Sequence, residues 1–367
     1  GSVLTGKTPT YTRTAFRLKI SLGNSVLPPT TTQELILPPK IYALQGLESN
    51  IYFRHTVDCD STIFDYDVVC SKGRQRLRNW RLTPTIADSG REYAFSLSCH
   101  DKKTHATQAT ATSKIVVANP SSNSGVTKKV MMLGDSWTAA GVTTQTILDN
   151  AASDVMKVEL VGTKGGGLNK HEGRGGWTVA RYNTNDADNI FWNGATSKFD
   201  FVNYLSVTSQ TAPDVVLIQL GINDVITSSN STAVVDTFNI AKAQLDDMIA
   251  SMKLANPSIK VALVPPATQG DQNAWDYTIG TPAWRAKINM FVWAREMINY
   301  FKEKEAQNIY VVGAGFGLDV DYNFPMETIP VNARNSQTET TMSDPYHAAS
   351  SGYKQIGDHL FAFIKTT

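Results

Sequence analysis

The pattern of apolar residues changes once along the 367-residue chain, and this change most limits how the chain can fold. Up to about residue 118, β-branched and aromatic residues alternate or cluster in short segments between polar residues. These segments are Ile51–Val57, Tyr66–Val69, Tyr93–Ser98 and Ser113–Val117. None of them has the 3.6-residue period of a helix, so we expect strands. Residues 1–118 therefore predict a small antiparallel β-sandwich.

The second part of the chain begins after a polar, turn-forming string, Asn119–Gly125, which predicts a linker over residues 119–127. Beyond it, short apolar runs typical of a buried parallel sheet alternate with helical patterns. The runs are Lys129–Leu133, Lys157–Val161, Val215–Leu220, Lys260–Val264 and Asn308–Val312, and the helical patterns are Thr138–Asn150, Ala233–Leu254, Ala283–Lys304 and Gly352–Ile364. This alternation predicts an α/β domain over residues 128–367, with a mostly parallel sheet between helices.

One turn in the first part resembles a feature of immunoglobulin-like sandwiches. The segment Asp88–Glu92 leads into Tyr93 and an alternating strand. In the tyrosine corner of such sandwiches, the hydroxyl of a Tyr at this place bonds back to nearby backbone. We therefore expect an Ig-like domain in which Tyr93 makes such a bond.

Charge and residue spacing exclude several classes of function. The chain has 34 Lys and Arg against 33 Asp and Glu and no dense basic run, unlike a nucleic-acid-binding protein. No apolar run approaches the roughly 20 residues that cross a membrane. The six His and three Cys lack the spacing of a metal site. Cys59 and Cys70 could be bridged across a hairpin, leaving Cys99 free, and three reduced thiols are the alternative.

Reactive residue types follow the predicted strands at their carboxyl ends, where α/β active sites lie. Ser136 opens a helix after the first strand of the second part, near outward-pointing N–H groups. Asn223 follows the third strand and can donate its amide to an oxyanion. Asp344 and His347 are three residues apart, so the carboxylate can orient the imidazole and leave its other nitrogen free as a base.

The segment Glu172–Thr178 is expected after the second strand of the second part and is rich in glycine, which lets a backbone N–H approach a ligand closely. Each of these four motifs alone also fits a helix cap, a turn or a flexible loop. Together they supply a nucleophile, a backbone donor, an amide donor and an oriented base. This set predicts acyl transfer through a serine.

The order Gly-Asp-Ser, Gly-rich loop, Gly-x-Asn-Asp and Asp-x-x-His resembles the SGNH (GDSL-type) hydrolase superfamily over roughly residues 126–367. The resemblance implies a flavodoxin-like three-layer α/β/α sandwich around a parallel sheet of about five strands. It also implies that Ser136 is the nucleophile, His347 the base and Asp344 the acid that orients the base. No metal or organic cofactor is implied.

The same resemblance implies an oxyanion hole formed by the N–H groups of Ser136 and Gly176 and the side-chain amide of Asn223. Gly173 and Gly175 are alternatives to Gly176, because the loop offers several glycines.

Three residues next to these motifs are candidates for substrate contact: Trp137, Trp177 and Asp224. Packing in the core is the alternative for both tryptophans. Aromatic residues among polar neighbours in two loops also suit the stacking and edge hydrogen bonds of sugar rings, with ordinary packing again the alternative. These are Tyr182, Phe191, Trp192, Phe199, Phe201 and Tyr204, and later Trp275 and Tyr277 beside Asp271, Gln272 and Asn273.

We therefore expect a serine esterase that removes O-acetyl or other acyl groups from a carbohydrate. The low fraction of charged residues (18%) and the additional β region fit a periplasmic, cell-surface or secreted protein, whose signal peptide is not visible in this sequence. A lysophospholipase or thioesterase is one alternative. The other is a glycan-binding or adhesion protein with an inactive hydrolase domain.

Overall fold

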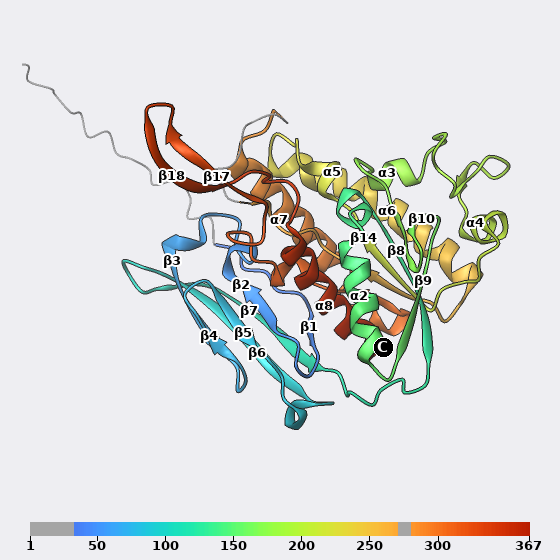
Figure 1. Cartoon of the computed structure of the whole chain (residues 1–367), viewed down its shortest axis with the longest axis horizontal. Coiled ribbons are helices and arrows are strands. Elements are labelled where there is room, and N and C mark those ends of the chain that lie inside the picture. Colours follow the sequence, from blue (N-terminus) through green and yellow to red (C-terminus); the bar gives the residue numbers. More distant parts are fainter. Residues whose placement is uncertain (1–32, 271–279) are drawn as a thin grey trace, which may run out of the picture. The chain divides into compact units, whose positions relative to one another are not determined.

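A seven-stranded, mostly parallel sheet follows a β-rich region in the computed structural model, which describes residues 33–270 and 280–367 (Figure 1). All of these residues belong to the unit Gln33–Thr367. The predicted boundary at residues 119–127 stays a prediction.

The β-rich region contains two sheets, as the sequence predicts. One has the order β1-β7-β6-β3 and the other β2-β5-β4. Their bounds are β1 Lys40–Ala43, β2 Ser49–Tyr52, β3 Phe64–Val69, β4 Arg74–Gln75, β5 Asn79–Leu82, β6 Glu92–Asp101 and β7 Thr107–Val117, with short 3₁₀ helices η1 Phe53–His55, η2 Ser61–Ile63 and η3 Ile86–Asp88. The predicted strand over residues 51–57 is therefore too long, because η1 begins at Phe53.

Two expectations for this region are corrected. The sheets are not wholly antiparallel, because β1 runs parallel to β7, with Ala43 opposite Val117. Long intervening chain lets β1 and β7 run in the same direction, whereas a tight hairpin would make them antiparallel. The Tyr93 hydroxyl donates to the carboxylate of Asp88 at 2.9 Å and not to backbone. The Ig-like assignment stays a prediction.

The large sheet has the order β10-β11-β8-β14-β15-β16, and β9 also pairs with β8. All neighbours in it are parallel except β10 and β11. The bounds are β8 Thr127–Gly134, β9 Lys157–Val161, β10 Lys164–Gly166, β11 Asn169–Gly173, β14 Val215–Gln219, β15 Lys260–Leu263 and β16 Ile309–Val311. The expected five strands are all present. The two additional strands, β10 and β11, form a polar hairpin without the apolar run of a buried strand.

Helices cover both faces of this sheet, so the fold is the expected three-layer α/β/α sandwich (Figure 1). Helix α2 packs against α8, and α6 packs against α7. The bounds are α1 Ser136–Ala139, α2 Val142–Ser153, α3 Val179–Tyr182, α4 Phe201–Thr208, α5 Ile222–Val225, α6 Ser231–Ala255, α7 Ala283–Phe301 and α8 Ser350–Thr366, with η5 Glu305–Gln307 and η6 Ala314–Gly317. Strands β8, β14 and β15 are buried between the layers, which explains their continuous apolar sequences.

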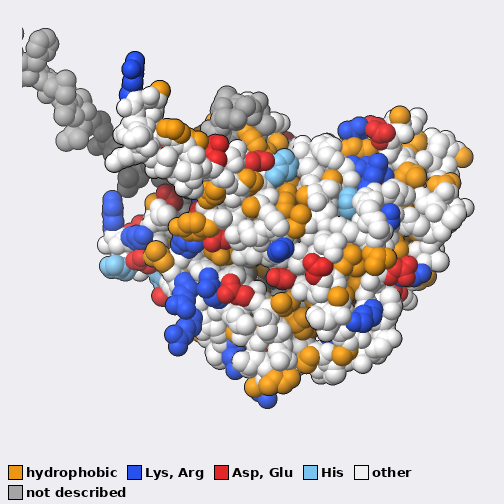
Figure 2. Space-filling view, in the orientation of Figure 1, with side chains coloured by type: hydrophobic (Ala, Val, Ile, Leu, Met, Phe, Trp, Pro, Cys, Tyr) orange, Lys and Arg blue, Asp and Glu red, His pale blue; other side chains and the backbone are white. Residues whose placement is uncertain are grey.

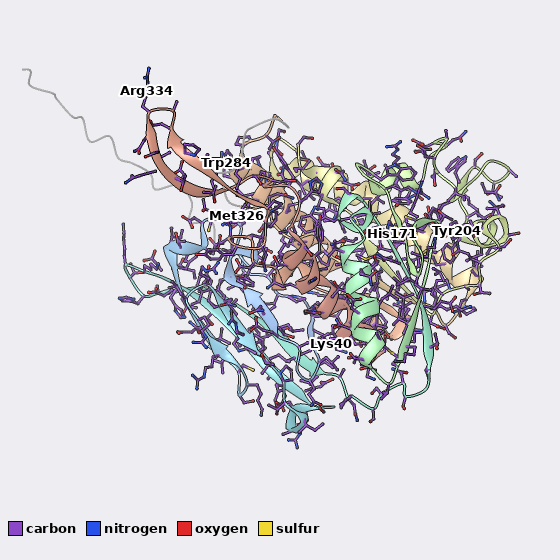
Figure 3. All side chains as sticks on the ribbon, in the orientation of Figure 1. Lys40, His171, Tyr204, Trp284, Met326 and Arg334 are labelled. Atoms are coloured by element: carbon purple, nitrogen blue, oxygen red, sulfur yellow. The ribbon has the colours of Figure 1, made fainter. Side chains whose placement is uncertain are left out.

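Two short hairpins complete the described chain. One pairs β12 (Trp192–Asn193) with β13 (Lys198–Phe199). The other pairs β17 (Met326–Asn332) with β18 (Asn335–Met342), is largely exposed and carries Arg334 in its turn (Figure 3). It ends two residues before Asp344.

The β-rich region packs against α8 and η6 of the α/β region. Tyr42 of β1 lies edge-on to the Phe363 ring of α8 at 5.1 Å between centroids. Arg54 pairs with Asp321 at 2.8 Å, and Arg78 pairs with Asp319 at 3.1 Å. Figure 2 shows Lys, Arg, Asp and Glu side chains scattered over one face, in keeping with the formal charge of +1.

Candidate active site

Ser136 stands at the sharp turn between β8 and α1. Asp135 caps the helix, because its carboxylate accepts a hydrogen bond from the Trp137 N–H at 2.9 Å. Gly134 permits the close approach of strand and helix, since a Cβ there would lie 2.2 Å from Thr138 Oγ1. The Gly-Asp-Ser sequence therefore makes a compact turn that presents the serine hydroxyl at a helix start.

His347 and Asp344 lie in the segment between β18 and α8 and reach this hydroxyl. His347 Nε2 is 3.0 Å from Ser136 Oγ, and His347 Nδ1 is 3.2 Å from Asp344 Oδ2. The other carboxylate oxygen, Asp344 Oδ1, accepts from the N–H groups of Tyr346 at 2.7 Å and His347 at 3.1 Å. The structure thus brings three residues separated by about two hundred positions into one hydrogen-bonded row.

This row is open to solvent. The side chain of His347 is 44% exposed and that of Asp344 is 37% exposed, whereas Ser136 is half-buried.

Asn223 lies on α5, directly after β14 and Gly221. Its side-chain amide donates to the carbonyl of Trp177 at 3.2 Å, which leaves a second amide hydrogen available. Gly221 has a φ of +129°, and a Cβ there would lie 2.1 Å from Trp293 Nε1, so only glycine fits this turn. The turn and the Trp177 contact fix where the amide of Asn223 lies.

Gly173 differs from the other glycines of the loop after β11. It is buried, its N–H donates to His171 Nδ1 at 3.1 Å, and a Cβ on it would lie 2.3 Å from the Ala139 nitrogen. Gly173 therefore lets β11 pack against α1, and its own N–H is already engaged.

Gly175 and Gly176 form the exposed corner of a turn that the Trp177 N–H closes on the Arg174 carbonyl at 3.2 Å. Gly176 has a φ of +73°, which the third position of a type II turn requires. Neither glycine N–H makes a hydrogen bond within the part of the chain that the structure describes. This loop follows β11 rather than β9, which corrects the expected position after the second strand.

A buried ion pair, which the sequence reasoning did not use, holds this loop in place. Arg174 and Glu172 approach to 2.7 Å with side chains that are only 5% and 0% exposed. Glu172 also accepts from the Tyr204 hydroxyl at 2.8 Å. Trp177 lies 5.0 Å from the Arg174 guanidinium and 4.7 Å from that of Arg181. The signal in the sequence was a pair of opposite charges flanking a glycine.

Two buried carboxyl groups lie beside the site. Burial, and secondarily the nearby charge of Asp224, raise the pKa of Asp135 to about 7. Burial also raises the pKa of Asp224 to about 7. Asp224 accepts from the Val179 N–H at 3.0 Å and so connects α5 to the start of α3. One carboxylate oxygen of Asp224 therefore has a backbone partner, and contact between Asp224 and substrate stays a prediction.

The tryptophans next to the motifs are buried, at 1% exposure for Trp137 and 3% for Trp177. Trp137 packs edge-on against Phe324 and Tyr353 and donates from its indole to the Tyr346 carbonyl at 3.1 Å. Both tryptophans are therefore packed in the core, which is the alternative given for them above.

The aromatic residues of the loop over residues 182–210 also pack together rather than face solvent. Phe191 stacks on Tyr204 at 4.2 Å and on Phe199 at 5.0 Å between ring centroids. The buried rings are Tyr182, Phe191, Phe199, Phe201 and Tyr204. The expectation that these five rings stack on sugars is therefore wrong, because each is covered by its neighbours, whereas Trp192 is half-buried and the expectation for it stays a prediction. Trp275 and Tyr277, with Asp271, Gln272 and Asn273, lie outside the described residues.

Three further observations concern residues 33–270 and 280–367. No group of three or more His, Cys, Asp or Glu side chains there could hold a metal ion. Cys59, Cys70 and Cys99 are free thiols, so the bridge between the first two is not formed. No helix in this part of the chain has both the length and the apolar character needed to cross a membrane.

A hydrogen-bonded Ser, His and Asp at the carboxyl end of a parallel α/β/α sheet is an arrangement that serine hydrolases use. Residues 130–360, more than half of the chain, match the model of the GDSL-like lipase/acylhydrolase family, so the chain belongs to this family. The protein is a carboxylic ester hydrolase.

Among solved structures, an acetyl esterase variant with acetate matches the chain with 20% identity, a TM-score of 0.37, and coverage of 65% of this chain and 96% of that one. A carbohydrate acetylesterase from Sinorhizobium meliloti has 14% identity, a TM-score of 0.38 and coverage of 65% and 98%. An aryl esterase from M. smegmatis has 15% identity, a TM-score of 0.37 and coverage of 65% and 98%. No curated protein matches the chain.

Proposed function

We propose that this esterase works through an acyl-enzyme on Ser136 and removes acetyl or other short acyl groups from a carbohydrate. The observation that carries the mechanism is the hydrogen-bonded row of Ser136, His347 and Asp344, with separations of 3.0 and 3.2 Å. In this row one imidazole nitrogen faces the hydroxyl and the other faces the carboxylate.

The reaction then runs in two halves. His347 takes the proton of Ser136 as Oγ attacks the ester carbonyl, and Asp344 stabilises the imidazolium. The N–H groups of Ser136 and Gly176 and the amide of Asn223 hold the oxyanion. His347 passes its proton to the departing alcohol, and a water molecule, activated by the same imidazole, releases the acid.

Two features favour a carbohydrate over a long-chain lipid. The exposed side chains of His347 and Asp344 leave room for a bulky hydrophilic alcohol. The segment that carries them, Ser343–His347, has the polar residues Ser343, Asp344 and His347, whereas a long acyl chain requires a mainly apolar lining.

The test compares acetylated polysaccharides, short p-nitrophenyl esters and long-chain acyl esters on the same enzyme. Ser136→Ala should lower kcat by at least roughly 10⁴-fold, and Asn223→Ala by about 10²–10³-fold. Ser350→Ala, an exposed serine at the start of α8, serves as the matched control and should keep wild-type rates. Retained activity in Ser136→Ala would refute the mechanism, and a preference for long-chain esters would refute the substrate class.

We also propose that the protein works outside the cytoplasm, with a separate β domain over residues 1–118. The low fraction of charged residues and the additional β-rich region support this location. Fractionation of the native host with an antibody against the protein tests it, and recovery in the cytoplasm alone would contradict it.

A further inference from the structure

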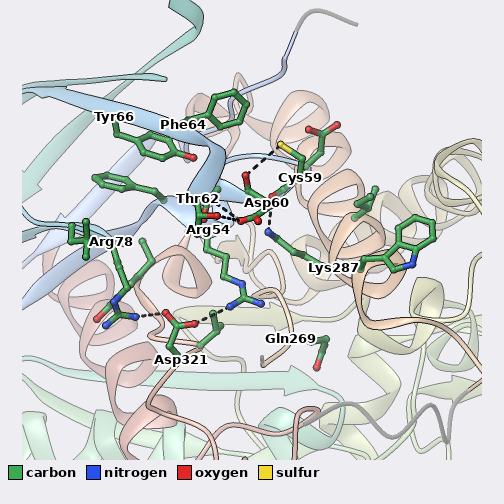
Figure 4. A pocket seen from close by; sticks show the side chains of 18 of the residues that line it. Arg54, Cys59, Asp60, Thr62, Phe64, Tyr66, Arg78, Gln269, Lys287 and Asp321 are labelled. Atoms are coloured by element: carbon green, nitrogen blue, oxygen red, sulfur yellow. Dashed lines mark hydrogen bonds and ion pairs between the residues drawn. The ribbon is translucent and has the colours of Figure 1, made fainter. Parts of the chain in front are cut away.

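A cavity of about 710 Å³ lies between the β-rich region and α7 (Figure 4). From the β-rich region it is lined by the end of β2, η1, η2, β3 and the chain around β4. From the α/β region it is lined by the first turns of α7, by Gln269 and Gly270 and by Val320 and Asp321. Ser136, Asp344 and His347 are not among its lining residues, so the cavity is separate from the catalytic row.

The wall formed by Gln269 and Gly270 connects the cavity to the catalytic base. The Gly270 N–H donates to the carbonyl of Pro345 at 3.0 Å. With its amide nitrogen toward the same segment, Gln269 donates to the carbonyls of Pro345 at 3.1 Å and Tyr346 at 3.2 Å. Pro345 and Tyr346 lie between the catalytic acid and base. A molecule in the cavity would therefore lie next to the segment that positions His347.

Aromatic rings line the cavity, but most of them cover one another. Phe53, Phe64 and Tyr66 are at most 8% exposed, with Phe53 stacked on Tyr66 at 4.4 Å and Phe64 edge-on to Tyr66 at 6.3 Å between centroids, so Trp284 presents the accessible ring. Trp284 enters the lining from α7 and is 54% exposed (Figure 3). Flat apolar faces combined with a few polar groups are typical of small-molecule sites and suit the C–H face of a sugar ring.

The hydroxyl of Tyr66 is a polar group without a partner in this lining. The residue is only 8% exposed, and the hydroxyl makes no hydrogen bond within the described part of the chain. A buried hydroxyl without a partner is unfavourable, and such groups call for a ligand or an ordered water. A hydroxyl of a bound sugar would satisfy it.

Lys287 places an ammonium group in the lining that forms no ion pair within the described residues. Its ammonium donates to the Cys59 carbonyl at 2.6 Å and has no carboxylate within ion-pair distance in residues 33–270 and 280–367. Arg54, in contrast, is neutralised by Asp321, which also pairs with Arg78. An ammonium has three donors, so Lys287 has hydrogens to spare for an anionic group in the cavity.

We propose that this cavity binds an acidic oligosaccharide, with a sugar ring on Trp284, a hydroxyl on Tyr66 and a carboxylate on Lys287. The inference rests on the proposed function for its setting, since it makes the acidic sugar a part of the glycan whose ester is hydrolysed. The enzyme would then act on acylated acidic polysaccharides.

The experiment measures binding by calorimetry to the full chain carrying Ser136→Ala, so that turnover plays no part. The ligands are trigalacturonic acid, the corresponding neutral trisaccharide of galactose, and tricarballylate, which has three carboxylates but no ring. Lys287→Met and Tyr66→Phe are introduced into this background. Lys302→Met, an exposed lysine directly after α7, is the matched control.

We expect the acidic trisaccharide to bind at least about tenfold more tightly than the neutral one, because a charge-assisted hydrogen bond is gained. Lys287→Met should remove this preference, Tyr66→Phe should weaken both sugars by roughly three- to tenfold, and Lys302→Met should change nothing. Absence of binding, equal affinity for the two trisaccharides, a preference that survives Lys287→Met, or equally tight binding of tricarballylate would each overturn the proposal.

If Lys287→Met does not fold, the pH dependence of binding to the Ser136→Ala protein tests the role of Lys287 instead. The charged or titratable groups that face the amine are Arg54, Cys59, Asp60 and Asp321. Burial, and secondarily the charge of Arg54, lower the pKa of Lys287 to about 8, whereas burial raises the pKa of Cys59 to about 11. The preference for the acidic sugar should therefore fall between pH 7 and 9.5, and a constant preference would contradict the role of Lys287.

This design distinguishes a failure of the proposed binding site from a failure of the proposed function. The trisaccharides carry no acyl group, so a negative result with intact esterase activity would overturn only the acidic-sugar site. Binding without activity on any acetylated polysaccharide would overturn only the proposed function.

Discussion

Replacing Asp344 with asparagine tests the role of the carboxylate with little change in shape. In the structure, Asp344 Oδ1 is held by the N–H groups of Tyr346 and His347, and Oδ2 faces His347 Nδ1. An asparagine oxygen would keep the two N–H bonds, which turns its NH₂ group toward Nδ1. Nδ1 must then accept a hydrogen bond, so the proton moves to Nε2, and Nε2 can no longer take the proton of Ser136.

The size of the effect follows from the separation and exposure of the pair. At 3.2 Å, an imidazolium and a carboxylate attract each other by about 1.3 kcal/mol at the dielectric constant of water and by about 5 kcal/mol at an effective value of 20. The half-exposed side chains place the pair between these limits, at about 3 kcal/mol, or roughly 10²-fold in rate. The unfavourable tautomer adds to this loss, so we expect kcat to fall by about 10²–10⁴-fold.

The assay is the steady-state hydrolysis of p-nitrophenyl acetate, with Asp188→Asn on an exposed loop as the matched control. The loss should appear in kcat with little change in KM, because the carboxylate acts on the imidazole and not on the ester. If Asp344→Asn keeps more than about a tenth of the wild-type kcat, the proposed orientation of His347 by Asp344 is refuted.

Three further predictions concern stability, measured by urea unfolding. Asp135→Asn removes a carboxyl group whose pKa is raised to about 7 by burial. Between about pH 4 and 7 the folded state keeps this proton and the unfolded chain has lost it. The free energy of unfolding of the wild type therefore falls as the pH rises through this range. The stability of the variant relative to wild type should therefore rise by up to about 1.4 kcal/mol per pH unit between pH 5 and 7, and a constant difference would contradict the raised pKa. Glu172→Ala leaves a buried guanidinium without its partner and should cost about 3–5 kcal/mol, whereas a loss below 1 kcal/mol would show that the pair does not hold the loop. Gly221→Ala combines a φ of +129° with a Cβ 2.1 Å from the Trp293 ring and should cost at least about 2 kcal/mol, whereas Gly166→Ala, with no atom within 4 Å, should cost little.

The parallel sheet could be predicted closely because its strands are buried on both faces. Such strands need continuous apolar runs, and β9 begins and ends where the run Lys157–Val161 does. The single predicted helix over residues 138–150 is in fact two, α1 and α2, separated by Gly141 at a φ of +71°. The glycine was visible, but whether a glycine breaks a helix depends on what packs beside it. The neighbour here is Asn169, which begins β11 and whose amide donates to the Gly141 carbonyl at 2.8 Å.

The hairpin of β17 and β18 could not be predicted, because its exposed strands have no apolar face and contain Pro330. The packing of the loop over residues 182–210 could not be predicted either. Aromatic residues among polar neighbours fit either a sugar-binding surface or a small packed cluster. Only the ring contacts around Phe191 distinguish the two.

By itself, the sequence determined the class of fold and the residue types of the site, since periodicity and turn chemistry are local properties of the chain. It also determined their order, from Ser136 to His347. Within residues 33–270 and 280–367, the tertiary structure decided which loop glycine has its N–H group engaged, which tryptophans are buried, and that a cavity lined by Lys287 adjoins the segment that precedes His347. These are relations between segments far apart in the chain, and they depend on packing distances that no local pattern encodes.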